Sequence, residues 1–179
     1  REILTDIAAS GSTVLISSHI LGELEKIATH YGIVRGGKMI VEMTAEELEA
    51  KITPNSKVLL LPYPNNPTGG IMTKADYEPI AKIVEKYNLF VICDEIYSEL
   101  VYGGEKHYSF AALPEMQERS VVLNGFSKAF AMTGWRLGYV CAPKEILKQM
   151  LKIHQYAIMC APTTSQYAGI KAAIDGDAD

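Results

Sequence analysis

Beyond residue 50, three apolar runs have the pattern of buried β-strands. They are Lys57–Leu61, Leu89–Cys93 and Val121–Asn124. Runs that stay apolar, without alternating polar positions, are typical of parallel strands in a sheet covered on both faces. We therefore expect these three segments to form a mostly parallel sheet.

The stretch between the first two runs has the spacing of an amphipathic helix. Ile80, Ile83 and Val84 recur at helical intervals, and Thr73 with Asp76 three residues later forms a capping box. The pattern predicts a helix that ends near residue 87. A helix between two parallel strands is a crossover connection, so the predicted fold class is α/β.

The first fifty residues have an α/β pattern of their own. Two helical periods surround the apolar run Thr13–Ser17, and Gly36-Gly37 separates two short strand-like runs at 31–35 and 38–42. Thr44 and Glu47 then form a capping box before a short helix that ends near Lys51.

Polar side chains follow each of the three predicted parallel strands. Asn65-Asn66 lie in the loop after the first strand, Asp94-Glu95 end the second, and Ser127-Lys128 follow the third. In open parallel sheets ligands bind outside the carboxyl ends of the strands. The pattern therefore predicts a ligand site formed by these loops.

Lys128 is flanked by apolar residues and glycines, and it has two interpretations. Most lysines are solvated surface residues. A lysine buried at a strand end would instead have a lowered pKa and a nucleophilic amine, as a Schiff-base lysine requires. Arg136, eight residues further on, could pair with a carboxylate or hold a phosphate through two hydrogen bonds.

The other polar residues also have structural and chemical interpretations. Asp94 could cap a helix that follows it, or its carboxylate could keep a pyridine nitrogen protonated. Tyr97 could be a packed aromatic or a donor to a ring oxygen. Asn66-Pro67 could be an ordinary turn, and this peptide bond is a candidate for the cis form.

Taken together, three segments carry a resemblance to a known family. They are PYPNNPTG at 62–69, VICDEIYSEL at 91–100 and NGFSKAFAMTGWRLGY at 124–139. Residues 51–179 resemble part of the large domain of class I and II aminotransferases, which are fold-type I enzymes dependent on pyridoxal 5′-phosphate. The aspartate aminotransferase type is the nearest resemblance.

The resemblance implies a role for each candidate residue. Lys128 is expected to form the internal aldimine with the cofactor and to move the proton during the reaction. Asp94 is expected to pair with the pyridine nitrogen, and Asn66 and Tyr97 to bind the 3′ oxygen of the ring. Arg136, with Ser127, is expected to hold the phosphate.

Some positions near the lysine carry no predicted side-chain contact with the cofactor. Many members of the family place a phosphate-binding serine three residues before the lysine, where this chain has Gly125. A side-chain ligand is therefore absent at that position, although the backbone amide could serve. Trp135 and Tyr139 are expected to belong to the core.

Residues 1–50 resemble a different family, the C-terminal end of an ABC-transporter ATP-binding domain. The run GSTVLISSHILGELEKIATHYGIVRGGKMIVEMTAEEL carries this resemblance. It implies that His19 is the histidine that contacts the γ-phosphate of ATP, although His19 could also be a capping or surface residue. The phosphate loop G-x-x-x-x-G-K-[ST] is absent from the sequence. The junction lies within 43–51, and we interpret the chain as a chimera of two partial domains.

Composition limits the alternatives. The chain has 179 residues, a net charge of −4 and 48% hydrophobic residues, without a cluster of basic residues. These values favour a globular protein over a nucleic-acid-binding one, and no apolar run approaches the roughly 18 residues of a membrane span. Three widely spaced cysteines are expected to be buried thiols in a reducing cytoplasm. No metal site is predicted.

The predicted function is that of a partial aminotransferase core. Such an enzyme moves an amino group between an amino acid and a 2-oxo acid, and the full-length family is expected to form homodimers. The alternatives are a lyase of the same fold family, a fragment of an ABC-transporter ATP-binding subunit, and a non-functional chimera. The residues that select the substrate are expected to lie outside this sequence, so the substrate is not predicted.

Overall fold

The computed structural model describes residues 33–35, 38–40 and 45–176. By its internal contacts the chain divides into two units, Arg1–Thr44 and Ala45–Asp179. Each unit is described by itself below.

The first unit contains a β-hairpin. Strands β1 (Ile33–Arg35) and β2 (Lys38–Ile40) pair antiparallel, with Val34 opposite Met39. This pairing confirms the hairpin predicted around Gly36-Gly37. The predicted strand at 13–17, the two helices beside it, His19 and the Thr44 cap lie outside the described residues.

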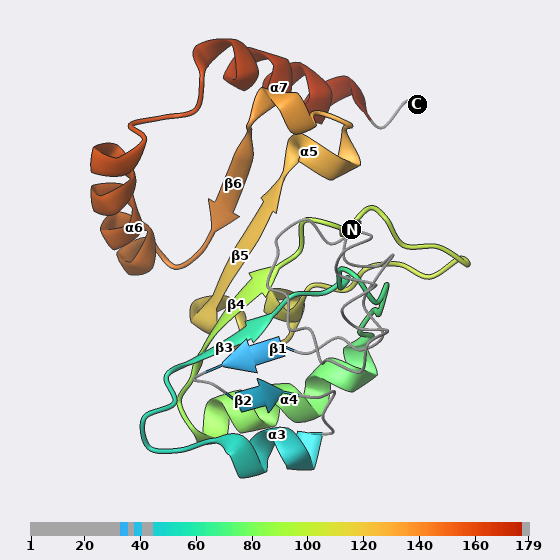
Figure 1. Ribbon diagram of the computed structural model, residues 1–179, viewed down its shortest axis with the longest axis vertical. Helices are drawn as coiled ribbons and strands as arrows, with labels where there is room; N and C mark the ends of the chain where they lie inside the picture. Colours follow the sequence, from blue (N-terminus) through green and yellow to red (C-terminus); the bar gives the residue numbers. More distant parts are fainter. Residues whose placement is uncertain (1–32, 36–37, 41–44, 177–179) are drawn as a thin grey trace, which may run out of the picture. The chain divides into compact units, whose positions relative to one another are not determined.

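The second unit is built on a four-stranded sheet in the order β3-β4-β5-β6. Strands β3 (Val58–Leu61), β4 (Phe90–Asp94) and β5 (Ser120–Gly125) are mutually parallel, as predicted. Strand β6 (Gly138–Cys141) pairs antiparallel with β5 and was not predicted. The sheet is therefore mostly parallel, with one antiparallel edge strand (Figure 1).

The helices of this unit differ in how well the sequence predicts them. The two expected helices are α3 (Ala45–Lys51) and α4 (Lys74–Lys86); the others are α5 (Phe126–Ala129), α6 (Lys144–Ala157) and α7 (Thr163–Asp175). The connection from β4 to β5 has two 3-10 turns, Phe110–Ala112 and Gln117–Arg119, in place of an α-helix.

No helix in the described part of the chain is both long and apolar enough to cross a membrane.

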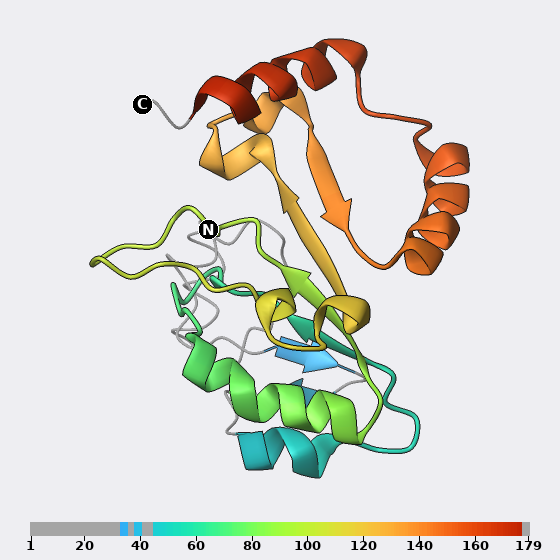
Figure 2. The ribbon, with the colours of Figure 1, turned by 180° about the vertical axis from the view of Figure 1, so that it is seen from behind.

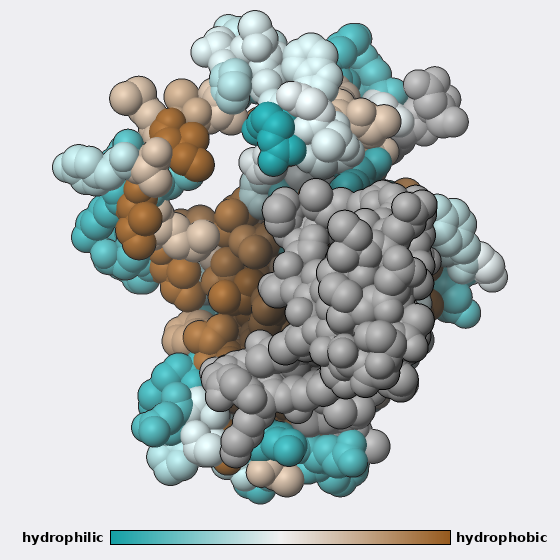
Figure 3. Space-filling model, viewed as in Figure 1, coloured by the Kyte–Doolittle hydropathy of each residue, from teal (hydrophilic) through white to brown (hydrophobic). Residues whose placement is uncertain are grey.

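The core lies between α4 and one face of the sheet (Figure 2). Tyr77 and Val84 of α4 pack there with Val91 and Cys93 of β4. The opposite face carries the exposed side chains of Val58, Leu60 and Phe90, and Figure 3 shows apolar surface beside these strands. The expectation of a sheet covered on both faces is therefore wrong for the described residues, which cover one face.

A capping box fixes the start of α4. The Thr73 hydroxyl accepts a hydrogen bond from the Asp76 backbone at 3.4 Å, and the Thr73 backbone donates to the Asp76 carboxylate at 2.8 Å. These reciprocal bonds satisfy two donors that the first turn of a helix leaves unpaired. They confirm the predicted cap.

Replacing Thr73 with alanine is expected to lower the free energy of unfolding by about 1 kcal/mol at neutral pH. Hydrogen bonds from the Thr73 backbone and hydroxyl hold the pKa of the Asp76 carboxyl below its usual value. A carboxyl with a lowered folded-state pKa stabilises the fold above about pH 4 and loses that contribution as the pH falls through the folded value. Urea unfolding at pH 7 and pH 2.5 measures the difference. Thr164→Ala, at an exposed position of α7, is the control, and an equal loss for Thr73→Ala at both pH values would contradict the prediction.

The cysteines correct one expectation. Cys93 is buried, and burial raises the pKa of its thiol to about 12. Cys141 and Cys160 are exposed, so the prediction of three buried thiols is wrong for two of them. All three are free.

Candidate active site

The loop after β3 is held by the side chain of Asn65. Its amide donates to the carbonyl of Pro62 at 3.2 Å, and its carbonyl accepts from the Thr68 hydroxyl at 2.9 Å. The Asn65 backbone nitrogen also donates to the carbonyl of Gly70 at 2.8 Å. These bonds make the loop a closed turn, and the next residue, Asn66, is exposed on it.

Two peptide bonds of this loop are cis. The Asn66–Pro67 bond is one of them, which confirms the prediction. The Tyr63–Pro64 bond is the other and was not predicted.

Three of the predicted site residues meet at the carboxyl end of the parallel strands. The Asn66 amide donates to the Tyr97 hydroxyl at 2.9 Å. The Lys128 ammonium lies 5.6 Å from the centre of the Tyr97 ring, within the range of a cation–π contact. Residues from the loop after β3, the turn after β4 and helix α5 are thus brought together, as the strand order predicts.

Lys128 is exposed. It lies in the short helix α5, directly after β5. Of the two interpretations of Lys128, the surface position is therefore found, and the lysine buried at a strand end is wrong for this chain. Exposure leaves the amine accessible to a ligand that enters from solvent.

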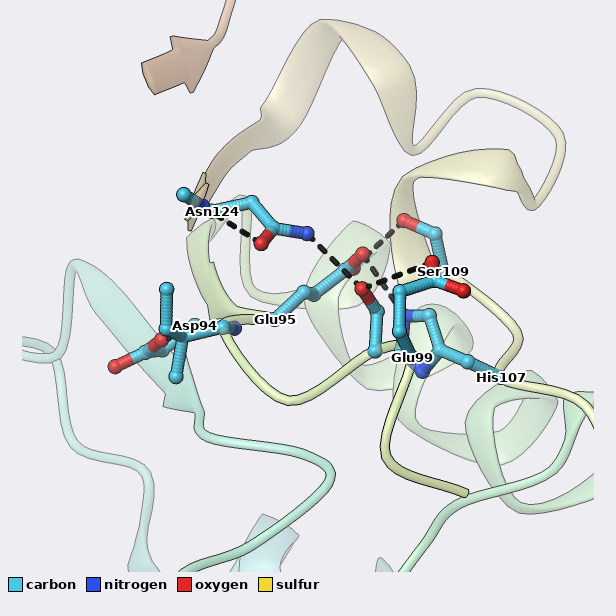
Figure 4. A network of polar contacts seen from close by, with 9 residues as sticks. Asp94, Glu95, Glu99, His107, Ser109 and Asn124 are labelled. Atoms are coloured by element: carbon cyan, nitrogen blue, oxygen red, sulfur yellow. Dashed lines mark hydrogen bonds and ion pairs between the residues drawn. The ribbon is translucent and has the colours of Figure 1, made fainter. Parts of the chain in front are cut away.

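Asp94 and Glu95 point to opposite sides of β4 (Figure 4). Asp94 is the last residue of the strand and is half-buried, and its carboxylate accepts from the backbone nitrogen of Ile96 at 3.3 Å. Asp94 thus caps the segment that follows it, but this segment is a turn at 96–99 and not the helix that was expected. One of the two Asp94 carboxylate oxygens makes the bond with Ile96, which leaves the other for a ligand.

Thr133 connects the two predicted phosphate ligands. Its hydroxyl donates to the carbonyl of Ser127 at 2.8 Å, and its own carbonyl accepts from the Arg136 guanidinium at 2.9 Å. Arg136 is exposed and has a left-handed backbone, with φ of 53°. Among the described residues, the Arg136 guanidinium makes no hydrogen bond with Asn66 or Tyr97.

Gly125 occupies a position that is crowded by backbone. A Cβ atom at this residue would lie 3.0 Å from the Cα of Gly138 and 3.0 Å from the carbonyl oxygen of Leu137. Gly138 is the first residue of β6 and pairs with Gly125, and Leu137 directly precedes it. The close pairing with β6 therefore gives a physical reason for glycine at this position.

Sequence reasoning missed a polar cluster behind the strand ends. Glu95 is buried, and its carboxylate accepts from the Ser109 hydroxyl at 2.7 Å and contacts His107 Nε2 at 2.9 Å. The alternation along β4 could have revealed this cluster, because Val91, Cys93 and Glu95 occupy the same face of the strand.

The prediction that Trp135 and Tyr139 belong to the core is wrong, since they are 46% and 47% exposed.

The arrangement of these loops has its counterpart in a known family. Residues 3–179 match the family model described as aminotransferase class I and II. The chain belongs to the class I and II aminotransferases. The match extends over most of the residues that resemble an ABC ATPase, as well as the predicted aminotransferase part.

Individual aminotransferases give the same result. A putative aminotransferase, YugH, from Bacillus subtilis is 49% identical over 136 residues, which are 76% of this chain and 35% of the relative. Aromatic-amino-acid aminotransferase 2 from Thermococcus litoralis is 41% identical over 152 residues, 80% of this chain and 39% of its own. The chain thus spans little more than a third of the length of these relatives.

Solved aminotransferase structures share the fold. The aromatic aminotransferase from Pyrococcus horikoshii aligns with a TM-score of 0.71 at 45% identity, over 73% of this chain and 35% of that one. The N-succinyldiaminopimelate aminotransferase from Mycobacterium tuberculosis aligns with a TM-score of 0.73 at 30% identity, over 82% and 38%. The second unit therefore has part of the fold-type I α/β architecture.

Aminotransferases of this type depend on pyridoxal 5′-phosphate, and the side chains present fit that group. Lys128 offers a primary amine for its aldehyde, and Asp94 offers a carboxylate oxygen for its ring nitrogen. Asn66 and Tyr97 form a joined pair suited to its ring oxygen, and Arg136 offers a guanidinium for its phosphate. Among the described residues, no group of three or more His, Cys, Asp or Glu side chains could hold a metal ion.

Proposed function

We propose that residues 51–179 are the cofactor-binding core of an enzyme that transfers an amino group between an amino acid and a 2-oxo acid. The observation that carries this proposal is the meeting of Asn66, Tyr97 and Lys128 at the ends of the parallel strands. Membership of the aminotransferase family supports the reaction class.

In this proposal each side chain holds a different part of pyridoxal 5′-phosphate. Asp94 keeps a proton on the ring nitrogen, because an ionised carboxylate favours a cationic partner. Asn66 and Tyr97 bind the ring oxygen: the Asn66 amide, which donates to the Tyr97 hydroxyl, places that hydroxyl so that its own proton can be donated to the ring oxygen. Arg136, with Ser127, holds the phosphate, for which a planar guanidinium is well shaped.

Lys128 has two roles in the proposal. Its Nζ would hold the cofactor through the aldehyde carbon, with loss of water. Once the amino group of the amino acid replaces Nζ at that carbon, the released amine would take the proton from the α-carbon of the amino acid. The bound cofactor supplies an electron sink for the charge that this proton leaves behind. The exposed position of Lys128 allows the amine to move between these tasks.

Reductive trapping tests the proposal. The purified chain is mixed with pyridoxal 5′-phosphate, reduced with borohydride and digested, and the labelled peptide is found by mass. We expect the label on Lys128, with complete loss of this label in Lys128→Ala. Lys144→Ala, which removes another exposed lysine, is the matched control and is expected to keep the label.

Label spread over many lysines, or an unchanged label in Lys128→Ala, would contradict the proposal and favour the non-functional chimera. A lyase of the same fold family would also trap cofactor on Lys128. Product analysis separates the two, because a transferase needs a 2-oxo acid to turn over and a lyase does not.

We also propose a second copy of this chain as its partner, as the family implies. Exposed apolar side chains at the end of α6 and after it support a contact surface; they are Ile153, Tyr156, Ile158 and Met159.

A cytoplasmic location is proposed as well, and it is supported by three free cysteines, which reducing compartments maintain.

For residues 1–50 we propose an origin from the end of an ABC-transporter ATP-binding domain. The hairpin β1–β2 supports this proposal, since it lies where the resemblance expects it. Amplification of genomic DNA across codons 43–51 tests whether the two parts are joined in the gene. Failure of the chain to bind ATP analogues would remove His19 as a nucleotide contact.

A further inference from the structure

We infer that Glu95 is a positioning residue that closes the segment 96–109 into a loop and thereby holds Tyr97 at the candidate site. This inference rests on the proposed function. Glu95 points to the opposite side of β4 from Asp94 (Figure 4), so its action on the cofactor goes through Tyr97.

The Glu95 carboxylate is tied at both of its oxygens. Oε1 accepts from the Ser109 hydroxyl at 2.7 Å, and Oε2 lies 2.9 Å from His107 Nε2. A carboxylate only accepts, so His107 donates, either as the Nε2–H tautomer or as the imidazolium. Glu95 is 5% exposed, and hydrogen bonds to a buried ionised group are stronger than those between neutral groups.

These bonds join the two ends of one connection. Glu95 follows β4 directly, while His107 and Ser109 precede the 3-10 turn Phe110–Ala112. The Glu95 backbone nitrogen donates to the carbonyl of Leu123 in β5 at 2.9 Å, which fixes Glu95 to the sheet. The end of the connection at His107 and Ser109 is thus held, through Glu95, to the sheet.

Tyr97 lies inside this closed segment, two residues after Glu95. The turn that carries it is held by the Ser98 nitrogen bonded to the Glu95 carbonyl and the Leu100 nitrogen bonded to the Tyr97 carbonyl, both at 2.9 Å. The Asn124 amide also donates to the Ser98 hydroxyl at 3.1 Å. Loss of the anchor would free the far end of the segment and loosen this turn.

The test compares three variants in the full chain. Glu95→Leu replaces the carboxylate with an apolar side chain of similar size and so removes both acceptor oxygens. Glu95→Gln keeps one carbonyl oxygen as an acceptor. Glu105→Gln makes the same neutralising change at an exposed position of the same segment. Amide hydrogen exchange at Ser98, Leu100 and Ala112 reports closure without any cofactor. The dissociation constant of pyridoxal 5′-phosphate and the visible absorption band of the bound cofactor report the position of Tyr97.

We expect Glu95→Leu to speed exchange at these three amides about 10-fold, with exchange in β4 and β5 unchanged, since the segment opens locally. It is expected to weaken cofactor binding about 10-fold and to shift the absorption band. Glu95→Gln, which keeps one of the two acceptors, should show both effects to a smaller but measurable extent, confined to the segment, and Glu105→Gln should show neither.

Equal acceleration in the segment and in the strands of Glu95→Leu would overturn the inference, because Glu95 would then serve general stability. Unchanged exchange in the segment would overturn it too. If Glu95→Leu does not fold, Glu95→Gln decides: faster exchange confined to the segment supports closure, and exchange like that of the unchanged chain in both segment and strands overturns it. Absence of cofactor binding by the unchanged chain would remove the proposed function, while the exchange data still decide closure.

Discussion

Replacement of Asp94 by asparagine is expected to weaken the binding of pyridoxal 5′-phosphate by about 100-fold. Removing one partner of a shielded charge pair costs about 2–5 kcal/mol, and Asp94 is half-buried, so the lower part of that range applies. Asparagine keeps the size and the oxygen that accepts from Ile96, so the change isolates the charge. Titration of cofactor absorbance measures the dissociation constant.

Glu99→Gln is the matched control for this prediction. Glu99 is an exposed carboxylate five residues further along the same segment, and its neutralisation is expected to leave cofactor binding within about 2-fold. Equal weakening in both variants would indicate a general effect of net charge, and the assignment of Asp94 to the ring nitrogen would then be wrong.

Replacement of Phe110 by alanine is expected to lower the free energy of unfolding by about 3–5 kcal/mol, the usual cost of truncating a buried phenylalanine. Phe110 is 0% exposed, and its ring packs edge-on against Tyr77 of α4, with the ring centres 5.4 Å apart. The alanine variant leaves a cavity between the β4–β5 connection and the helix. Urea unfolding followed by circular dichroism measures the loss.

Tyr102→Ala provides the comparison, because Tyr102 belongs to the same connection but is 80% exposed. Its truncation is expected to change the free energy of unfolding by less than about 0.5 kcal/mol. A loss below about 1 kcal/mol in Phe110→Ala would contradict the assignment of this connection to the core.

Local signals explain which elements the sequence predicts. Helix α4 has a complete capping box and a regular apolar face, and strands β3, β4 and β5 each contain a run of three or four consecutive apolar residues, so neighbouring residues alone define them. Strand β6 has three exposed residues and pairs with β5 through long-range contacts. Such pairing leaves little trace in a short window of sequence.

The candidate site likewise combines residues that local sequence patterns predict with features that depend on long-range packing. Asn66, Tyr97 and Lys128 follow predicted strands, and the rule that ligands bind at the carboxyl ends of strands brings them together. The sequence left open whether Lys128 is exposed or buried, because its exposure depends on how α5 and its neighbours pack. The partners of Glu95 come from 12 and 14 residues away, across an irregular connection that no periodicity describes.

The opposed directions of Asp94 and Glu95 make the length of β4 a constraint on chemistry. Successive side chains of a strand alternate between its faces, so a shift by one residue exchanges the two faces. A one-residue insertion or deletion within 91–93 would turn the Glu95 carboxylate toward the ligand edge and drive Asp94 into the core. Both changes would occur without altering any site residue, so this strand tolerates substitution far better than a change in length.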